Sequence, residues 1–121
     1  NAPEMLVVDG EFKANETEMF DLAHKGLLDL FLQDILGYGF SNWIELLPRI
    51  TKLGVQASPH CWKSLTKTIY AAYFGMAFVH VPTVEGVTCT SKDLDFGGFR
   101  IENGYFIPSE KPGFGITRIR K

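Results

Sequence analysis

Short apolar runs alternate with stretches of helical periodicity over the first two-thirds of the chain. The apolar runs are residues 5–8, 27–32, 55–58 and 81–84, and the helical stretches are residues 16–25, 42–53 and 63–78. The runs are apolar instead of alternating with polar residues, which is typical of strands in a parallel sheet that are buried on both faces. The order β-α-β-α-β-α-β with short connections therefore predicts an α/β fold whose parallel sheet is covered by helices.

Capping and breaking residues indicate where the helices begin and end. Asn15, followed three residues later by Glu18, resembles a capping box at the start of the first helix, and Gly26 ends that helix. Ser41 is a candidate cap for the second helix. That helix contains Pro48, and we expect an irregularity there because proline lacks the backbone N–H that a helix interior uses.

A histidine and three acidic residues follow the four apolar runs. They are Glu11, Asp34, His60 and Glu85. Right-handed crossovers place the carboxyl ends of parallel strands on one rim, where α/β folds position their ligands and catalytic groups. Pro59 ends the third strand just before His60, whose imidazole can exchange a proton near neutral pH. The pattern predicts a site for proton transfer on this rim.

Charge and cysteine content exclude several classes of partner. The net charge of −2 over 121 residues provides no basic surface for nucleic acid or for an acidic membrane. No apolar run reaches the roughly 20 residues that a membrane helix requires. Cys61 and Cys89 have no CxxC spacing and form no disulfide framework, so we expect a reducing compartment, the cytoplasm.

The composition changes after residue 86. Residues 93–121 are rich in glycine, proline and aromatic residues. Residues 101–106 predict a β-hairpin, because Asn103-Gly104 is the dipeptide preferred in a type I′ turn. The last quarter of the chain is thus a tail that lacks the βα pattern.

Six short motifs, in order and at consistent spacing over nearly the whole chain, resemble one family. They are residues 9–11 (DGE), 33–35 (QDI, followed by a glycine-containing loop and Trp43), 57–60 (ASPH), 82–86 (PTVEG), 101–105 (IENGY) and 111–115 (KPGFG). Each motif is weak alone. Together they resemble the enolase superfamily, specifically its mandelate racemase/muconate lactonizing enzyme-like members of the mandelate racemase branch.

The resemblance implies the C-terminal half of a modified TIM (β/α)-barrel. Residues 1–92 would form strands five to eight with their helices, as a partial catalytic domain, and residues 93–121 would form a C-terminal tail that packs on the capping domain. Four strands cannot close a barrel and leave unpaired edges. We therefore expect a partner, the N-terminal half of the same protein with the capping domain and strands one to four, and a homo-oligomer. The lack of an initiating Met also favours a piece of a longer protein.

The resemblance also implies roles for the rim residues. Glu11 falls on the third acidic Mg²⁺ ligand, with Asp9 as the rival, and one carboxylate alone cannot hold this ion. Asp34 and His60 fall on an Asp–His dyad, in which the carboxylate fixes the imidazole tautomer. Glu85 falls on the acid that hydrogen-bonds an enediolate intermediate, which requires a protonated carboxyl whose pKa is raised by burial and neighbouring charge.

The implied reaction is Mg²⁺-dependent proton abstraction next to the carboxylate of a small acid sugar. Dehydration to a 2-keto-3-deoxy acid, with the Asp34–His60 dyad as acid and base, is the first hypothesis. We expect Ser58 and Trp62 to contact this substrate. A racemase or epimerase of the same superfamily is the first alternative, and it would use a lysine from an early strand outside this chain. A non-catalytic fragment or half-barrel structural module is the second alternative.

Overall fold

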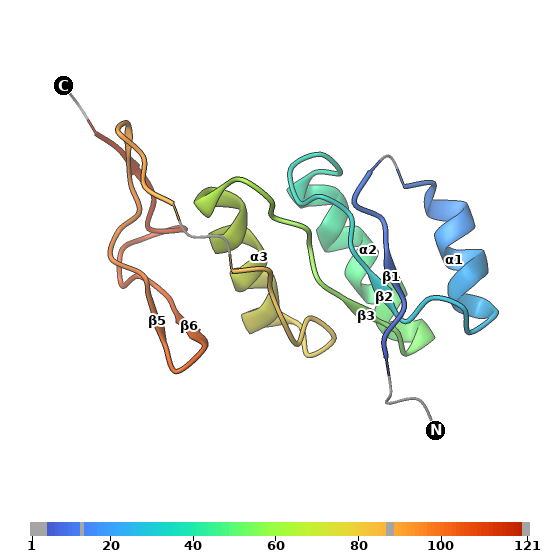
Figure 1. The fold of residues 1–121 in the computed structure, drawn as a ribbon. Coiled ribbons are helices and arrows are strands. Elements are labelled where there is room, and N and C mark those ends of the chain that lie inside the picture. Colours follow the sequence, from blue (N-terminus) through green and yellow to red (C-terminus); the bar gives the residue numbers. More distant parts are fainter. Residues whose placement is uncertain (1–4, 13, 87–88, 120–121) are drawn as a thin grey trace.

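The computed structural model describes residues 5–12, 14–86 and 89–119. Its elements follow one another in space much as they do in the sequence (Figure 1), from α1 beside the sheet to the hairpin at the far end. The elements are β1 (Val8–Asp9), α1 (Glu16–His24), β2 (Leu30–Phe31), α2 (Phe40–Leu53), β3 (Gln56–Ala57), α3 (Leu65–Ala77), β4 (Leu94–Asp95), β5 (Arg100–Glu102), β6 (Tyr105–Ile107) and β7 (Thr117–Arg118).

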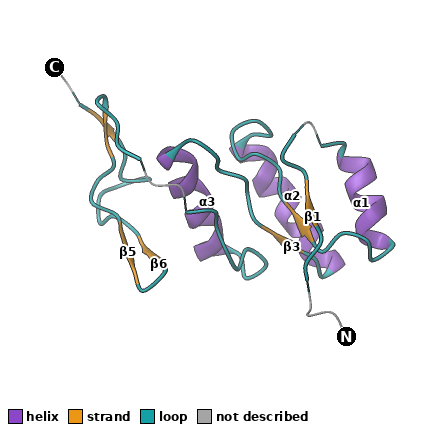
Figure 2. Cartoon of the chain, in the orientation of Figure 1, coloured by secondary structure: helices purple, strands orange, loops and turns teal. Residues whose placement is uncertain are grey.

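The first three strands form a parallel sheet in the order β1-β2-β3, with a helix after each strand (Figure 2). Leu30 of β2 pairs with Val8 of β1 on one side and with Gln56 of β3 on the other. The sequence predicted this parallel βα arrangement, and the structure confirms it. Each strand has two residues and is shorter than its apolar run, and β1 extends one residue past the end of that run.

Helix boundaries agree with the sequence signals at both ends of α1 and at the end of α2. α1 ends at His24, and Gly26 follows its C-cap residue Lys25 with a φ of 67°. The Asn15 side chain accepts hydrogen bonds from the backbone N–H groups of Thr17 and Glu18, which confirms the predicted cap of α1. Gly54 ends α2 in the left-handed conformation. The prediction that Ser41 caps α2 is wrong, because the helix begins two residues earlier than expected, at Phe40, with Gly39 at the N-cap position. In the part of the chain that the structure describes, no helix is long and apolar enough to cross a membrane.

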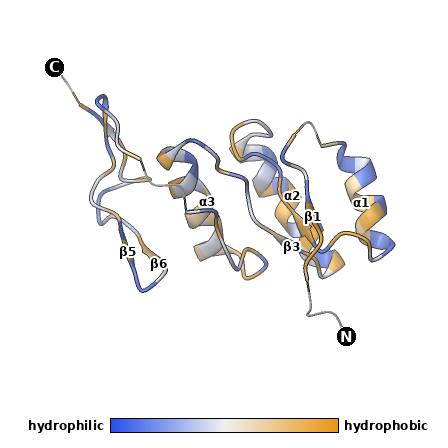
Figure 3. Cartoon of the chain, in the orientation of Figure 1, coloured by the Kyte–Doolittle hydropathy of each residue, from blue (hydrophilic) through white to orange (hydrophobic). Residues whose placement is uncertain are grey.

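The core lies between the sheet and α2. Trp43, Leu46, Leu47 and Ile50 of α2 are fully buried in the same hydrophobic cluster as Phe31 of β2, whose ring packs edge-on against Phe20 of α1. Hydrophobic residues accordingly mark the strands and the sheet-facing part of the neighbouring helices in Figure 3. Burying side chains of this size contributes roughly 1.5–3 kcal/mol each, so α2 is the main support of the sheet.

The predicted fourth strand, residues 81–84, does not form. The segment has no strand pairing, and the hydrogen bond from the Ala57 N–H to the His80 carbonyl, at 2.8 Å, is its nearest link to β3. Pro82 has no N–H to donate, so a ladder cannot extend through it on that side. This part of the chain instead runs from the end of α3 as an irregular segment.

The first apolar run is not buried as predicted. Met5 and Leu6 are 78% and 55% exposed, and Val8 of β1 is also exposed. β1 is an edge strand that pairs with β2 alone among the described residues. One face and one edge of this run therefore lack the neighbours that its sequence pattern predicts.

The tail forms two antiparallel strand pairs, β5 with β6 and β4 with β7. Glu102 pairs with Tyr105, and Asn103 and Gly104 between them both have positive φ angles, of 52° and 82°. This confirms the predicted hairpin, since a type I′ turn requires positive φ at both central residues. The tail contacts α3 through Phe114, whose ring lies 4.5 Å from that of Tyr70. That it also packs on a capping domain stays a prediction.

A polar network connects α1, α2 and the loop between β2 and α2. The Tyr38 hydroxyl donates to Glu16 at 2.6 Å, and Arg49 forms an ion pair with the other oxygen of Glu16. The hydrogen bond from Tyr38 lowers the pKa of Glu16, and so do the hydrogen bond and the positive charge of Arg49. Partial burial acts in the opposite direction but is outweighed, so the pKa of Glu16 lies below its usual value. Burial, together with the same bond to Glu16, raises the pKa of Tyr38 to about 12.

We predict that Glu16→Gln destabilises the intact protein near neutral pH and has little effect in acid. The folded-state pKa of Glu16 lies below its unfolded value. Its contribution is therefore present above the unfolded pKa and is lost as the pH falls through the folded pKa. Thermal unfolding of the variant and the parent at pH 7 and at pH 3 measures this. Glu18→Gln in the same helical turn is the control, and an equal loss at both pH values would contradict the prediction.

Candidate functional site

Two predicted site residues are backbone neighbours beyond the ends of β2 and β3. The parallel register that pairs Phe31 with Ala57 continues three residues later as a bridge between Asp34 and His60. His60 donates its N–H to the Gln33 carbonyl and accepts from the Ile35 N–H, both at 3.0 Å. His60 is only 8% exposed. The sheet thus fixes the relative positions of these two residues.

The Asp34 carboxylate is held by three donors. Its Oδ1 accepts from the backbone N–H groups of Leu36, at 2.9 Å, and Gly37, at 2.7 Å. Its Oδ2 forms an ion pair with Lys67 of α3, and both side chains are 20% exposed. Burial opposes ionisation of Asp34, but Lys67 and the two N–H groups together outweigh it and lower its pKa. Asp34 is therefore an anchored carboxylate anion.

The His60 imidazole lies beside Glu85. Its Nδ1 is 3.1 Å from Oε2 of Glu85, a distance for an ion pair, although the angle is not that of an aligned hydrogen bond. The same Oε2 accepts the Cys61 N–H at 3.0 Å, and the Cys61 thiol donates to the Glu85 carbonyl at 3.0 Å. Cys61 thus holds both the backbone and the carboxylate of Glu85 next to His60.

The structure pairs the predicted residues differently from the predicted dyad. Among the hydrogen bonds and ion pairs of the described residues, none joins the Asp34 carboxylate to the His60 imidazole. His60 instead faces Glu85, and Asp34 faces Lys67. All three predicted catalytic residues are close to one another in the fold, but their side-chain partners are not those of an Asp–His dyad.

Asp9 is the last residue of β1, and Glu11 follows it by two residues. Both are exposed, and Asp9 accepts the Gly10 N–H at 2.6 Å. No group of three or more His, Cys, Asp or Glu side chains within the described ranges could hold a metal ion. A Mg²⁺ ion needs several oxygen ligands. That Glu11 or Asp9 contributes a carboxylate to a Mg²⁺ ion stays a prediction.

The two predicted substrate contacts differ in exposure. Ser58 is buried, and its N–H donates to the Phe31 carbonyl at 2.9 Å. Trp62 is 57% exposed and follows Cys61 directly. A large exposed indole two residues from His60 is available to contact a ligand, whereas Ser58 is placed as part of the strand end. Their roles toward a substrate stay predictions.

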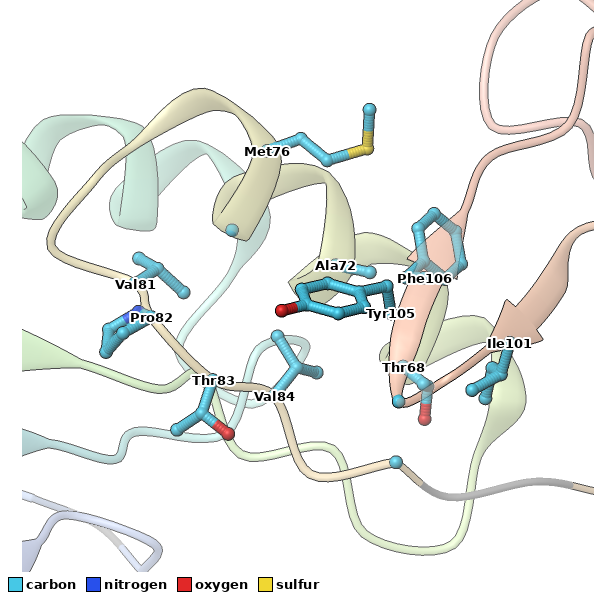
Figure 4. A pocket seen from close by; sticks show the side chains of 13 residues that line it. Thr68, Ala72, Met76, Val81, Pro82, Thr83, Val84, Ile101, Tyr105 and Phe106 are labelled. Atoms are coloured by element: carbon cyan, nitrogen blue, oxygen red, sulfur yellow. The ribbon is translucent and has the colours of Figure 1, made fainter.

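A cavity of about 340 Å³ lies between α3, residues 81–86 and the β5–β6 hairpin (Figure 4). Met76 of α3, Val84 and the Tyr105 ring are among its mainly apolar lining residues. None of the predicted site residues lines it. The residues that line the cavity include no acid, no histidine and no lysine.

Sequence reasoning missed Lys67 and the backbone of Cys61. Lys67 is the third residue of α3, and a cation in the first turn of a helix is opposed by the helix dipole. Such a residue, seven positions after a strand-end histidine, signals a carboxylate partner nearby. No sequence signal identifies the N–H of Cys61 as a donor to Glu85, because any residue at that position has this group.

The chain matches known proteins along almost its entire length. A family model described as enolase C-terminal domain-like matches residues 3–120. A galacturonate dehydratase from Geobacillus sp., solved with D-galacturonate and 5-keto-4-deoxy-D-galacturonate, is 33% identical with a TM-score of 0.77, over 94% of this chain and 30% of that one. None of the curated proteins compared with the chain matches it.

Two further solved structures contain magnesium. A mutant of the Geobacillus galacturonate dehydratase, complexed with Mg, is 34% identical with a TM-score of 0.76, over 93% of this chain and 29% of that one. A mandelate racemase/muconate lactonizing protein from Geobacillus sp., complexed with magnesium and tartrate, is 31% identical with a TM-score of 0.72. The match covers 94% of this chain and 29% of that one. The chain thus spans about 30% of the length of these structures.

We predict that Gly10→Ala destabilises the protein and displaces Glu11. Gly10 has a φ of +120°, and an added Cβ would lie 2.9 Å from Cε of Met19 and 3.2 Å from the Gln33 nitrogen. Backbone strain of this kind costs about 1–3 kcal/mol. Urea unfolding measures the loss. Gly86→Ala, where an added Cβ meets nothing within 4 Å, is the control, and an equal midpoint for both variants would contradict the prediction.

Proposed function

Because the chain belongs to the enolase C-terminal domain-like family of the enolase superfamily, we propose that it is the part of a Mg²⁺-dependent lyase that moves protons on an acid sugar. The observation that supports this most directly is the position of His60. It is a buried imidazole at a strand end, with its backbone beside Asp34 and its side chain beside Glu85. Membership of the family also makes the chain a portion of a TIM-type barrel, as the sequence predicted.

His60 is the proposed base and acid. Its Nδ1 faces Glu85, which leaves Nε2 to take a proton from the substrate carbon next to the carboxylate. Such a proton is weakly acidic, so the resulting enediolate needs stabilisation before any base can remove it. We propose that Glu85, when protonated, donates a hydrogen bond to the enediolate, and that Asp34, whose backbone is bridged to that of His60, is the dyad partner of this imidazole in the complete site.

Glu11 is the proposed ligand of Mg²⁺ from this chain, with Asp9 as the rival. In the part of the chain that the structure describes, no hydrogen bond or ion pair engages the Glu11 carboxylate, which agrees with its availability to a cation. When bound, the ion lowers the cost of negative charge on the substrate carboxylate. The remaining ligands would belong to the N-terminal half of the protein.

Dehydration is the proposed outcome of proton removal. After His60 takes the proton, the imidazolium can protonate the hydroxyl on the next carbon, which leaves as water, and the enol becomes a 2-keto-3-deoxy acid. The ligands of the 33%-identical relative agree with this pattern. D-galacturonate and 5-keto-4-deoxy-D-galacturonate differ by one water, lost between the carbon next to the carboxylate and its neighbour. A uronic or aldonic acid is therefore the proposed substrate class, bound with Trp62 and Ser58.

A racemase or epimerase is the second candidate. The likeness to a mandelate racemase/muconate lactonizing protein solved with tartrate favours it. It would need a second base on the opposite face of the substrate, a lysine of an early strand outside this chain. The two candidates differ in products, because an epimerase exchanges the substrate proton with solvent without loss of water.

The proposed partner is the N-terminal half of the same protein, with a capping domain and strands one to four. The exposed apolar run before β1 and the 30% span of the solved relatives support this. A homo-oligomer and a cytoplasmic location remain part of the proposal. If the half-barrel were instead a structural module without catalysis, no sugar acid would react in the experiment below.

We predict that His60→Asn abolishes turnover in the full-length protein. Removing a general acid or base typically lowers the rate about 10²–10⁴-fold. A panel of uronic and aldonic acids in deuterated buffer is assayed for 2-keto-3-deoxy products and for deuterium at the carbon next to the carboxylate. His24→Asn, on the exposed face of α1, is the control and should retain full activity. Unchanged turnover in His60→Asn would exclude His60 as the base.

We also predict that activity depends on a divalent ion. Treatment with EDTA followed by desalting should remove activity, and Mg²⁺ should restore it. Glu11→Gln should raise the Mg²⁺ concentration needed for half-maximal activity, because a neutral amide is a weaker ligand for a hard cation. Asp9→Asn is the matched comparison one residue before Gly10. The variant that needs the higher Mg²⁺ concentration identifies the ligand. If neither variant differs from the parent, the end of β1 is not part of the metal site.

A further inference from the structure

A large aromatic side chain is exposed close to the proposed base. Trp62 is 57% exposed, and it follows His60 by two residues in the segment that connects β3 to α3 (Figure 1). Among the described residues, no hydrogen bond, ring contact or cation–π contact engages its indole. Trp43, in contrast, is fully buried, and its ring packs against those of Tyr38 and Phe74. Trp43 therefore belongs to the core, whereas Trp62 is available to a ligand.

The turn that carries Trp62 is held in place on both sides. Before it, Cys61 is fully buried, and its N–H and its thiol both bond to Glu85. After it, the buried Leu65 begins α3. Within the turn, Lys63 has a φ of 64°, a left-handed conformation that is unfavourable for a residue with a Cβ and persists only where the surrounding structure imposes it. The exposed position of Trp62 is therefore imposed by its neighbours.

Trp62 is close enough to His60 for one small molecule to contact both side chains. Two residues of extended chain span at most about 7 Å, so the Cα atoms of Trp62 and His60 are no farther apart than that. A six-carbon sugar acid is comparable in length, and the indole adds its own reach. A substrate whose reacting carbon lies at His60 can therefore place its remaining carbons against the indole.

The flat face of an indole distinguishes a sugar ring from an open chain. An aromatic face carries partial negative charge and attracts the weakly positive hydrogens of C–H groups that lie beside oxygen atoms. A pyranose ring presents several such C–H groups rigidly on one side. A uronic acid closes into this ring because it retains an aldehyde, whereas an aldonic acid has no aldehyde and stays open. The open chain loses more conformational freedom when it is held against a flat surface.

We propose that Trp62 is a specificity-determining residue that stacks on the pyranose face of a uronic acid and makes this protein prefer uronic acids to aldonic acids. This assignment rests on the proposed function, which supplies His60 as the base and a sugar acid as the substrate, and it narrows two substrate classes to one. The indole N–H, which has no partner among the described residues, is available to donate to a hydroxyl of the ring.

The test compares each uronic acid with the aldonic acid that forms when its aldehyde is reduced. D-galacturonate with L-galactonate and D-glucuronate with L-gulonate are such pairs, because their members are identical around the carboxylate and differ in ring closure. Dissociation constants are measured by calorimetry with Mg²⁺ in full-length His60→Asn protein, in which the acid is not consumed. KM and kcat are measured with His60 intact. The variants are Trp62→Leu, Trp62→Phe and, as the control, Tyr105→Leu, which removes a 74% exposed aromatic ring of the β5–β6 hairpin.

We expect Trp62→Leu to weaken binding of the uronic acid about tenfold and of its aldonic partner less than about threefold, because only the ring has a rigid face to lose. Trp62→Phe keeps an aromatic face and should retain most of the preference, and Tyr105→Leu should change neither constant. In turnover the loss should raise KM and leave kcat near the parent value, since the contact is the same before and during the reaction.

An equal loss for both acids in Trp62→Leu would overturn the proposal, and so would a parent that prefers the aldonic acid. If a uronic acid reacts but Trp62→Leu binds it as the parent does, the enzyme assignment stands and the role of Trp62 is lost, because the indole then contacts something else, such as the N-terminal half. If no sugar acid binds or reacts, both assignments fail. Thermal unfolding checks the folding of each variant, and Trp62→Gln replaces Trp62→Leu if the latter does not fold.

Discussion

The parallel hydrogen bonding between β2 and β3 is the constraint on which the site depends. It pairs Phe31 with Ala57 and extends past both strands to bridge Asp34 with His60. Without it, the loop after β2 and the turn after β3 would place their polar residues independently. The register itself is fixed by the buried side chains, because a slip of one residue would turn the fully buried Phe31 away from its ring contact with Phe20 of α1. The position of the site thus follows from packing in the core.

The strand register explains why the sequence predicted Asp34 and His60 as neighbours but did not predict the partners of their side chains. The βα period and the strand-ending Pro59 suffice to place Asp34 and His60 as neighbours, and the family resemblance added a role for each. Side-chain partners depend on rotamers and on a third element. Lys67 reaches Asp34 from α3, and Glu85 reaches His60 from beyond that helix. Neither contact follows from strand order or from spacing in the sequence.

The wrong prediction of burial for residues 5–8 and the wrong prediction of a strand at residues 81–84 have a common physical cause. The apolar runs at residues 5–8 and 81–84 have the composition of strands buried on both sides, yet the first is exposed at a sheet edge and the second is unpaired. The hydrophobic pattern of a segment indicates the environment in which that segment is stable, and this environment can include neighbours outside the chain. The segments that the sequence assigned correctly, β2 and β3, are those whose neighbours lie within this chain.

The placement of a cation on α3 connects the fold to the chemistry. A lysine in a first helical turn is unfavourable unless an anion compensates it, and Asp34 does so at the cost of its availability to His60. Glu85 lies beside the nearly buried His60 imidazole from the segment after α3, 3.1 Å from its Nδ1. The side-chain partners of the residues at the strand ends are therefore provided by α3 and by the segment that follows it.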